Sequence, residues 1–213
     1  MGVPVSKTQP YTGSFYDAIR SGSQSSAAVI VPLVIGHLGA VESVVDVGCG
    51  EGWWGHEFTK HLPWSITALG IDGEYVETCA IPMEAVDLGH RFDLGRRFDV
   101  AVCLEVAEHL PPERADGFVA DLCRLADTVV FSAAMPRQGG VGHVNLEPPS
   151  YWASLFRGQG FGWEDPIRRR VWQSPSVEPW YASNLLVFRE GAGRMEGDPD
   201  WLIHPKLWLT PRS

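Results

Sequence analysis

Short apolar runs alternate with amphipathic segments along this chain. The runs at 43–47, 65–72, 98–105 and 128–134 are rich in apolar and β-branched residues, as strands buried on both faces are. A shorter strand is expected at 85–87. Helical segments lie between these runs, so strands and helices take turns through most of the sequence. This alternation predicts an α/β fold built on a mostly parallel sheet.

Helix-start and helix-stop residues mark four expected helices. The first covers 25–39, with Ser25 or Ser26 as its N-cap and Gly39 as its stop. Pro32 should kink this helix or lie near its first turn. The other three helices are expected at 53–61, 111–126 and 150–160.

The last part of the chain contains a predicted pair of strands, a polar linker and an apolar cluster, in that order. Segments 167–172 and 181–190 predict a closing antiparallel pair of strands, so the sheet should be doubly wound and mostly parallel with an antiparallel edge strand. A polar linker follows, and then an apolar cluster at 201–209. We therefore expect one domain over 1–190 and a tail over 191–213 that docks on it, closes over a site or binds a partner.

Composition limits the classes of function. The 213 residues are 45% hydrophobic and 20% charged with a net charge of −9, which describes an acidic globule of one domain. That charge opposes tight binding of phosphate backbones, so no nucleic-acid partner is expected. The chain has no stretch long enough to span a bilayer and no signal-peptide pattern at its start, which favours a cytoplasmic location without a membrane partner. The sequence is also compatible with a homodimer.

The arginine run and the cysteines give further limits on the possible kinds of binding site. Arg168–Arg170 has two interpretations, a solvated strand edge or a contact with an anion. The cysteines lack a C-x-x-C pair and the spacing of a zinc site, so we expect them to be reduced. They are Cys49, Cys79, Cys103 and Cys123.

The stretch SVVDVGCGEGWWG, residues 43–55, combines the first strand with closely spaced glycines. A phosphate-binding P-loop requires a Lys and a Ser or Thr after its last glycine, where Trp53 and Trp54 stand. A dinucleotide fingerprint requires a third glycine at the position of Trp53. An NAD(P)-dependent oxidoreductase therefore remains only as an alternative.

This stretch resembles motif I of the class I S-adenosylmethionine-dependent methyltransferases, which is an apolar strand, an acid (Asp46) and G-x-G-x-G. Gly48, Gly50 and Gly52 would let the backbone pass close to the cofactor, and the charge of Asp46 suits an ammonium and a sulfonium. The resemblance implies a Rossmann-like, seven-stranded fold with helices on both faces. It also implies S-adenosyl-L-methionine as the cofactor.

The resemblance implies further cofactor contacts after the next strands, in order. Asp72 ends the second strand, where the family's acid accepts the ribose hydroxyls. Asp87 and Leu88 follow the third strand, where the family holds the adenine. In the fourth-strand motif, Leu104 and Glu105 would pass the methionine end of the cofactor.

Two more expected cofactor contacts lie nearer the N-terminus. Cys49 stands between the glycines, and Tyr16 belongs to an N-terminal lid and helix over 1–40. Segments 131–145, 151–156 and 178–188 are similar to a bacterial branch of the superfamily that is often met beside sugar and antibiotic-type secondary-metabolite genes. The resemblance runs from Tyr11 to Phe188 and implies transfer to a small-molecule acceptor.

Two histidines at the carboxyl ends of strands are candidates for the general base of an O-methyl transfer. His143 lies in a glycine-rich loop with no apolar period, which favours a role at the active site. His109 follows the fourth strand and has either a catalytic or a cofactor-side role. Asn145 would orient His143 or bind the acceptor. The predicted reaction is O-methylation of a small secondary metabolite or a sugar.

A metal-assisted reaction is the main alternative. Glu105, Glu108 and His109 would share one face of a helix starting there, and His143 would complete a set of two carboxylates and two imidazoles. The set is similar to the E-x-x-E-H cluster of small-RNA 3′-end and ubiquinone-pathway methyltransferases, which implies Mg²⁺. A further alternative is a non-catalytic cofactor-binding protein whose apolar tail contacts a partner.

Overall fold

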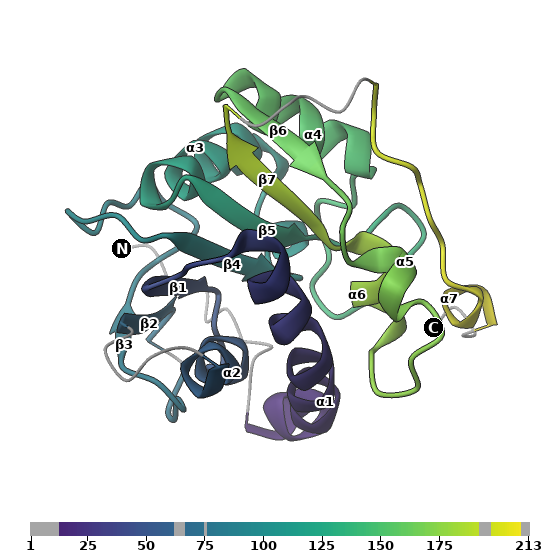
Figure 1. The fold of residues 1–213 in the computed structure, drawn as a ribbon, viewed down its shortest axis with the longest axis horizontal. Helices are drawn as coiled ribbons and strands as arrows, with labels where there is room; N and C mark the ends of the chain where they lie inside the picture. Colours follow the sequence, from purple (N-terminus) through teal and green to yellow (C-terminus); the bar gives the residue numbers. More distant parts are fainter. Residues whose placement is uncertain (1–12, 62–66, 75, 192–196, 210–213) are drawn as a thin grey trace, which may run out of the picture.

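A seven-stranded sheet forms the centre of the molecule (Figure 1). The computed structural model describes residues 13–61, 67–74, 76–191 and 197–209, without the side chains of 13–18 and 208–209. The strand order is β3-β2-β1-β4-β5-β7-β6. The strands are β1 (Ser43–Val47), β2 (Thr67–Asp72), β3 (Met83–Ala85), β4 (Val100–Leu104), β5 (Thr128–Ser132), β6 (Phe161–Glu164) and β7 (Leu186–Glu190).

The sheet is mostly parallel, as the sequence predicts. β1 pairs in parallel with β2 and β4, and the parallel pairing continues outward to β3 and β5. β7 runs antiparallel to both β5 and β6, so the reversed strand lies one place inside the edge that β6 forms. The predicted Rossmann-like class is confirmed.

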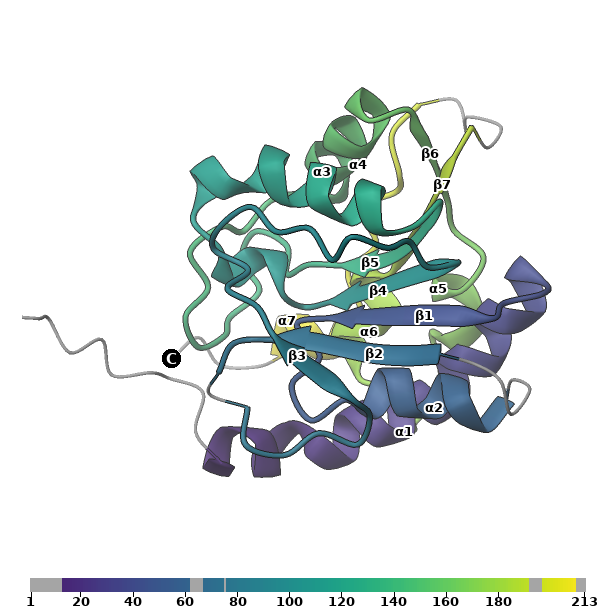
Figure 2. The ribbon, with the colours of Figure 1, turned by 90° about the vertical axis from the view of Figure 1, so that its left-hand side faces the viewer.

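Helices cover both faces of the sheet (Figure 2). α3 (Ala115–Leu125) and α4 (Pro149–Gly158) lie on one face, whereas α1 (Gly13–Leu38) and α2 (Trp53–His61) lie on the other. The shorter helices are η1 (Ala107–His109), η2 (Pro112–Arg114), α5 (Arg168–Val171), α6 (Pro179–Asn184) and α7 (Pro205–Leu209). No described helix has both the length and the hydropathy that a membrane crossing needs.

Two apolar clusters fill the spaces between helices and sheet. Phe118 of α3, Phe131 of β5 and Phe156 of α4 belong to one cluster, and Ile30 of α1 and Phe58 of α2 belong to the other. All five side chains are buried. Because both faces of the central strands are covered, these strands carry apolar residues at successive positions instead of alternating ones.

The first helix differs from the prediction at its start. α1 is already helical at Gly13, so neither Ser25 nor Ser26 caps it and that prediction is wrong. Ser26 is instead buried, and its hydroxyl accepts a hydrogen bond from the Glu178 backbone N–H at 3.0 Å. Pro32 lies inside the helix, and Gly39 follows its end with φ of 84°, as a C-terminal glycine does.

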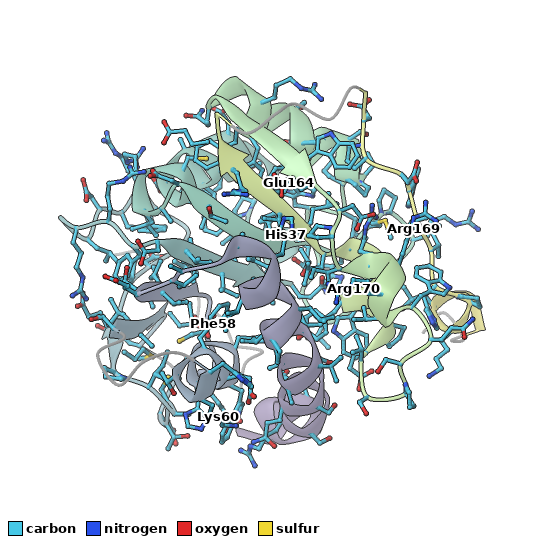
Figure 3. The ribbon with its side chains drawn as sticks, in the orientation of Figure 1. His37, Phe58, Lys60, Glu164, Arg169 and Arg170 are labelled. Atoms are coloured by element: carbon cyan, nitrogen blue, oxygen red, sulfur yellow. The ribbon has the colours of Figure 1, made fainter. Side chains whose placement is uncertain are left out.

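The predicted closing pair of strands is correct only in the later part of its second member, because residues 181–184 belong to α6 and β7 covers Leu186–Glu190. Segment 167–172 holds the helix α5, and the partner of β7 is β6, six residues earlier. β6 begins directly after Gly160, whose φ of 86° turns the chain out of α4. His37 in the last turn of α1 contacts Glu164 of β6 at 2.5 Å between Nε2 and Oε2 (Figure 3).

Arg168 anchors the tail and is neither a solvated edge residue nor an anion contact. Its side chain is fully buried and donates from Nη2 to Asp165 Oδ2 at 2.9 Å. Nη1 donates to the carbonyls of Ser183 and Asp200, at 3.0 and 2.9 Å. Arg169 next to it is exposed and pairs with the Asp200 carboxylate at 2.8 Å (Figure 3).

These two neighbouring arginines give a matched test of burial. Arg168→Ala should lower the free energy of unfolding by about 3 kcal/mol, because it leaves the partly buried Asp165 carboxylate and two carbonyls without their donor. Arg169→Ala removes only an exposed ion pair and should cost less than about 0.5 kcal/mol. Urea denaturation of both variants measures the difference, and equal losses would contradict the anchoring role.

Candidate active site

The loops after β1, β2, β4 and β5 meet at one edge of the sheet. They do so because these strands are parallel and all carry their carboxyl ends to the same side (Figure 2). Open sheets of this kind bind ligands at that edge. The predicted cofactor and acceptor residues of the central strands therefore come together there.

The glycine loop after β1 depends on backbone conformation. Gly48, Gly50 and Gly52 have φ of 71°, 50° and 75°, which L side chains rarely adopt. A Cβ on Gly48 would lie 2.4 Å from Val106 Cγ2, and one on Gly52 would lie 2.4 Å from Cys79 Sγ. These two glycines are thus required by the turn and by its close packing on the protein itself.

Asp46 is a buried acid beneath that loop. Its side chain is 3% exposed, and Oδ2 accepts a hydrogen bond from the Gly55 N–H at 2.9 Å. Burial raises the pKa of Asp46 to about 7. No described Lys, Arg or His pairs with it. A bound cation would favour its ionised form, which fits the ammonium and sulfonium of S-adenosylmethionine.

Asp72 ties the end of β2 to the glycine loop. Its Oδ2 accepts from the Gly50 N–H at 2.8 Å, and its Oδ1 accepts from the Gly73 N–H at 2.7 Å. Asp87 lies two residues beyond β3, is largely exposed and pairs with His90 at 2.8 Å, which lowers the pKa of Asp87. Leu88 beside it is buried.

The remaining predicted cofactor contacts vary in exposure. Cys49 is buried within the loop, and Leu104 at the end of β4 is partly buried. The side chain of Tyr16 and the whole of Tyr11 lie outside the described residues. Cofactor contacts at these positions stay predictions.

The turn after β4 is tighter than the predicted helix. Glu105 has a φ of 56°, and the following η1 is a single 3-10 turn, so Glu105, Glu108 and His109 do not share an α-helical face. Strained backbone of this kind costs about 1–3 kcal/mol and is often found at functional sites. The carboxylate of Glu105 instead accepts hydrogen bonds from Asn184 Nδ2 at 3.1 Å and Gln138 Nε2 at 3.4 Å.

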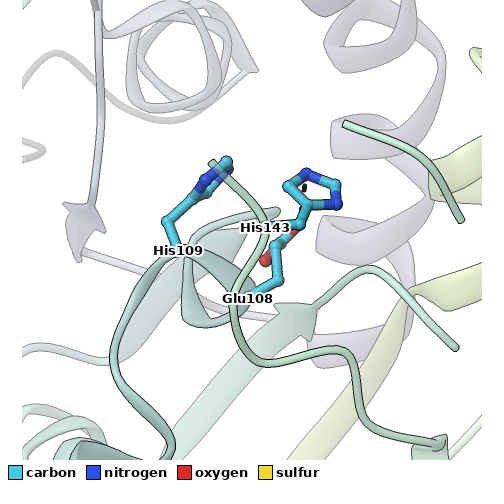
Figure 4. Close-up of side chains that lie close together, drawn as sticks. All are labelled: Glu108, His109 and His143. Carbon is cyan, nitrogen blue, oxygen red and sulfur yellow. Dashed lines mark ion pairs between the residues drawn. The ribbon is translucent and has the colours of Figure 1, made fainter. Parts of the chain in front are cut away.

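His143 is brought to Glu108 by two backbone hydrogen bonds. The N–H groups of Val144 and Asn145 donate to the Glu108 carbonyl at 2.8 and 3.0 Å. As a result, His143 Nε2 lies 4.0 Å from Glu108 Oε1, and the rings of His143 and His109 are 4.8 Å apart (Figure 4). One ligand-type atom from each of Glu108, His109 and His143 falls within 4.8 Å of the others.

Burial controls the charges in this cluster. Glu108 is fully buried, which raises its pKa together with the charge of neighbouring Glu105. Burial also lowers the pKa of His143 and takes that of His109 to about 4. Both imidazoles are therefore neutral near pH 7, the form that accepts a proton or binds a metal ion.

Glu105 has three side-chain hydrogen-bond partners that the sequence did not predict. Asn184 and Gln138 donate to its carboxylate, and Ser132 Oγ accepts from its backbone N–H at 3.2 Å. All three lie inside the segments 131–145 and 178–188 that carry the resemblance. In the sequence, these positions are recognisable only as polar residues near apolar strands. That pattern does not show that they contact Glu105.

Part of the chain matches a known family. Residues 25–125, which include the glycine loop and the turn after β4, match the model of a methyltransferase-domain family. No curated protein sequence is significantly similar to the chain.

Solved structures share the fold at low identity. An O-methyltransferase family protein from Burkholderia thailandensis is 15% identical over 85% of this chain and 60% of its own, with a TM-score of 0.63. Magnesium protoporphyrin IX methyltransferase from Synechocystis with bound S-adenosylmethionine is 21% identical over 85% and 86%, with a TM-score of 0.58. A sugar N-methyltransferase from Streptoalloteichus is 17% identical over 89% and 99%, with a TM-score of 0.62.

The fold and the edge site define a Rossmann-like domain with a glycine loop after β1. The chain carries a methyltransferase-domain match over residues 25–125, within the fold that the solved methyltransferases share. It spans 60% of the length of the Burkholderia protein.

The raised pKa of Asp46 predicts a pH-dependent stability. Between the usual value of 3.8 and about 7, the folded protein keeps a proton on Asp46 that the unfolded chain releases. The contribution of Asp46 to the free energy of unfolding should therefore fall by up to about 1.4 kcal/mol for each pH unit in this range and level off above it.

Asp46→Asn removes this titration while keeping an oxygen for the Gly55 N–H. In urea denaturation without cofactor from pH 4 to 8, the stability of the wild type relative to the variant should decline up to about pH 7. A constant difference at every pH would show that Asp46 is ionised throughout.

Proposed function

We propose that this protein methylates a hydroxyl oxygen of a small-molecule acceptor, with S-adenosylmethionine as methyl donor and His143 as general base. The observation that carries the proposal is the position of His143. Its imidazole lies against buried Glu108, beyond the carboxyl ends of β4 and β5 and on the same edge as the glycine loop.

The residues of the donor side fit this cofactor. Asp46 and the glycine loop would hold its methionine end, Asp72 its ribose, and Asp87 with Leu88 its adenine. When bound, S-adenosylmethionine supplies a methyl group already activated for in-line displacement. Because the carbon is activated, the protein mainly has to align the nucleophile and exclude water.

The acceptor side supplies a base. A neutral His143 would take the proton of the acceptor hydroxyl at a ring nitrogen, and the neighbouring Glu108 carboxyl would orient the ring and stabilise its charged form. Base catalysis of this kind contributes about 10²- to 10⁴-fold and is needed more by a hydroxyl than by an amine. This requirement supports O-methylation.

Similar structures include enzymes for a sugar and for a porphyrin, which supports a small acceptor.

An NAD(P)-dependent oxidoreductase and a non-catalytic cofactor-binding protein are the competing functions. Calorimetry with S-adenosylhomocysteine and with NADH separates the first from our proposal. Binding of NADH alone would overturn the methyltransferase function.

His143→Ala should lower kcat at least about 100-fold while affinity for S-adenosylhomocysteine changes less than about twofold, since the base acts only in the chemical step. The assay follows release of S-adenosylhomocysteine with phenols, catechols and simple sugars as acceptors. His61→Ala, a partly exposed histidine at the end of α2, is the control. Wild-type turnover of His143→Ala would remove this residue from the reaction, and His109→Ala tests the second candidate.

The cluster also supports a second function, a methyl transfer assisted by a divalent cation. Neither carboxylate oxygen of Glu108 has a hydrogen bond of ordinary geometry within the described residues, although the side chain is fully buried. A cation between Glu108, His109 and His143 would compensate that buried carboxylate and lower the pKa of a bound acceptor hydroxyl. Two imidazoles and one carboxylate suit Mn²⁺ or Zn²⁺ better than Mg²⁺.

Metal titration distinguishes the two versions of the reaction. In the metal-assisted version, Mn²⁺ should bind the wild type in calorimetry, and Glu108→Gln should weaken that binding at least about 100-fold because the amide carries no charge. Glu113→Gln, an exposed acid of η2, should leave it unchanged. Full turnover in the presence of a chelator would exclude the metal and leave His143 as the base.

A further inference from the structure

The tail and the loop after β5 line a half-open cavity. Residues 135–138 form one wall, and Trp201, Ile203 and Leu207 form the other. Its volume is about 370 Å³, within the usual range of small-molecule sites of roughly 300–1,000 Å³. This cavity lies outside the donor loop and outside the cluster of Glu108, His109 and His143.

The walls are mainly apolar, with polar groups from Arg137 and Gln138 only. Trp201 keeps 51% of its surface exposed, and Val141 and Val144 on either side of His143 keep 56% and 58%. Among the described residues, one other large apolar side chain, Ile19, is exposed to a comparable degree. An exposed apolar side chain on a cavity wall, as Trp201 is, supports a binding site there.

The tail wall is fixed to the domain. Trp163 Nε1 donates to the Gly197 carbonyl at 3.2 Å, and buried Arg168 donates to the Asp200 carbonyl. The His204 N–H donates to Ser183 Oγ at 3.0 Å, and its ring contacts the Trp172 carbonyl at 2.9 Å. The segment carrying Trp201 and Ile203 is therefore attached on both sides, as a preformed pocket requires.

The cavity adjoins the proposed base through Gln138. Gln138 lines the cavity, and its side chain donates to the Glu105 carboxylate and accepts from Asn184. Gly140, two residues further on, lies under the His143 ring, since a Cβ there would be 2.1 Å from His143 Cε1. A molecule in the cavity would thus extend toward His143.

We propose that this cavity binds a flat apolar ring system of the acceptor and presents its hydroxyl to His143, so that the C-terminal tail selects the acceptor. The proposal rests on the methyl transfer proposed above. The walls of the cavity favour an acceptor with a fused or aromatic ring over a single sugar ring. A sugar would place hydroxyls against Met135, Ile203 and Leu207, where they would have no hydrogen-bond partners.

Two probes that differ by one ring test the proposal. Catechol and 2,3-dihydroxynaphthalene carry the same pair of hydroxyls, and only the second has a fused ring to fill the cavity. In calorimetry with the full chain saturated with S-adenosylhomocysteine, the naphthalene diol should bind at least tenfold more tightly than catechol. Equal affinities, or no binding of either probe, would overturn the proposal.

Variants of the tail locate the binding. Ile203→Ala should weaken the naphthalene diol about tenfold and Ile203→Trp, which fills the cavity, should abolish its advantage over catechol. Leu202→Ala changes the neighbouring residue, which is not part of the lining, and should have no effect. Equal effects at 202 and 203 would show that the tail acts only through stability.

Failure of this proposal and failure of the methyl transfer give different results. If the proposal is correct and the diol is methylated, Ile203→Ala raises KM and leaves kcat within about twofold. Preference for the naphthalene diol without any methyl transfer would contradict the proposed function alone. Methyl transfer without that preference would contradict the cavity proposal alone.

Discussion

Glu108 is fully buried beneath the loop that carries His143, and this burial controls the charges of the proposed acceptor site. A carboxylate withdrawn from water costs several kcal/mol unless a partner compensates it. The carbonyl of the same residue accepts two backbone hydrogen bonds from the loop, so one short turn positions both the acid and the imidazole. The strained Glu105 makes this turn possible, because it bends the chain directly after β4.

The proposed cofactor site also contains a buried acid. Asp46 is buried near the end of β1, and this burial raises its pKa to about 7. Asp72 fixes the glycine loop through the Gly50 N–H. Asp46 and Glu108 are therefore both buried acids with raised pKa values, and a positively charged ligand beside either one would favour its ionised form.

Local pattern predicted most of the elements because it is a local property. β1 was expected at 43–47 and lies there, since a buried parallel strand is an apolar run that a glycine turn ends. The error at 167–172 has the same origin. An arginine-rich segment resembles an exposed edge. Nothing in the local sequence shows that Arg168 is buried and donates to the carbonyls of Ser183 and Asp200.

The amino-acid order alone was sufficient for the fold class and for the places of the glycine loop, Asp46 and Asp72 in it, because each follows from a strand and the residues at or directly after its end. Contacts between distant segments were not accessible in this way. These contacts join segments 33 to 79 residues apart. They are the approach of His143 to Glu108, the hydrogen bonds of Asn184 and Gln138 to Glu105, and the tail wall of the cavity. Such contacts depend on how the strands are ordered in the sheet, which the spacing of residues along the chain does not encode.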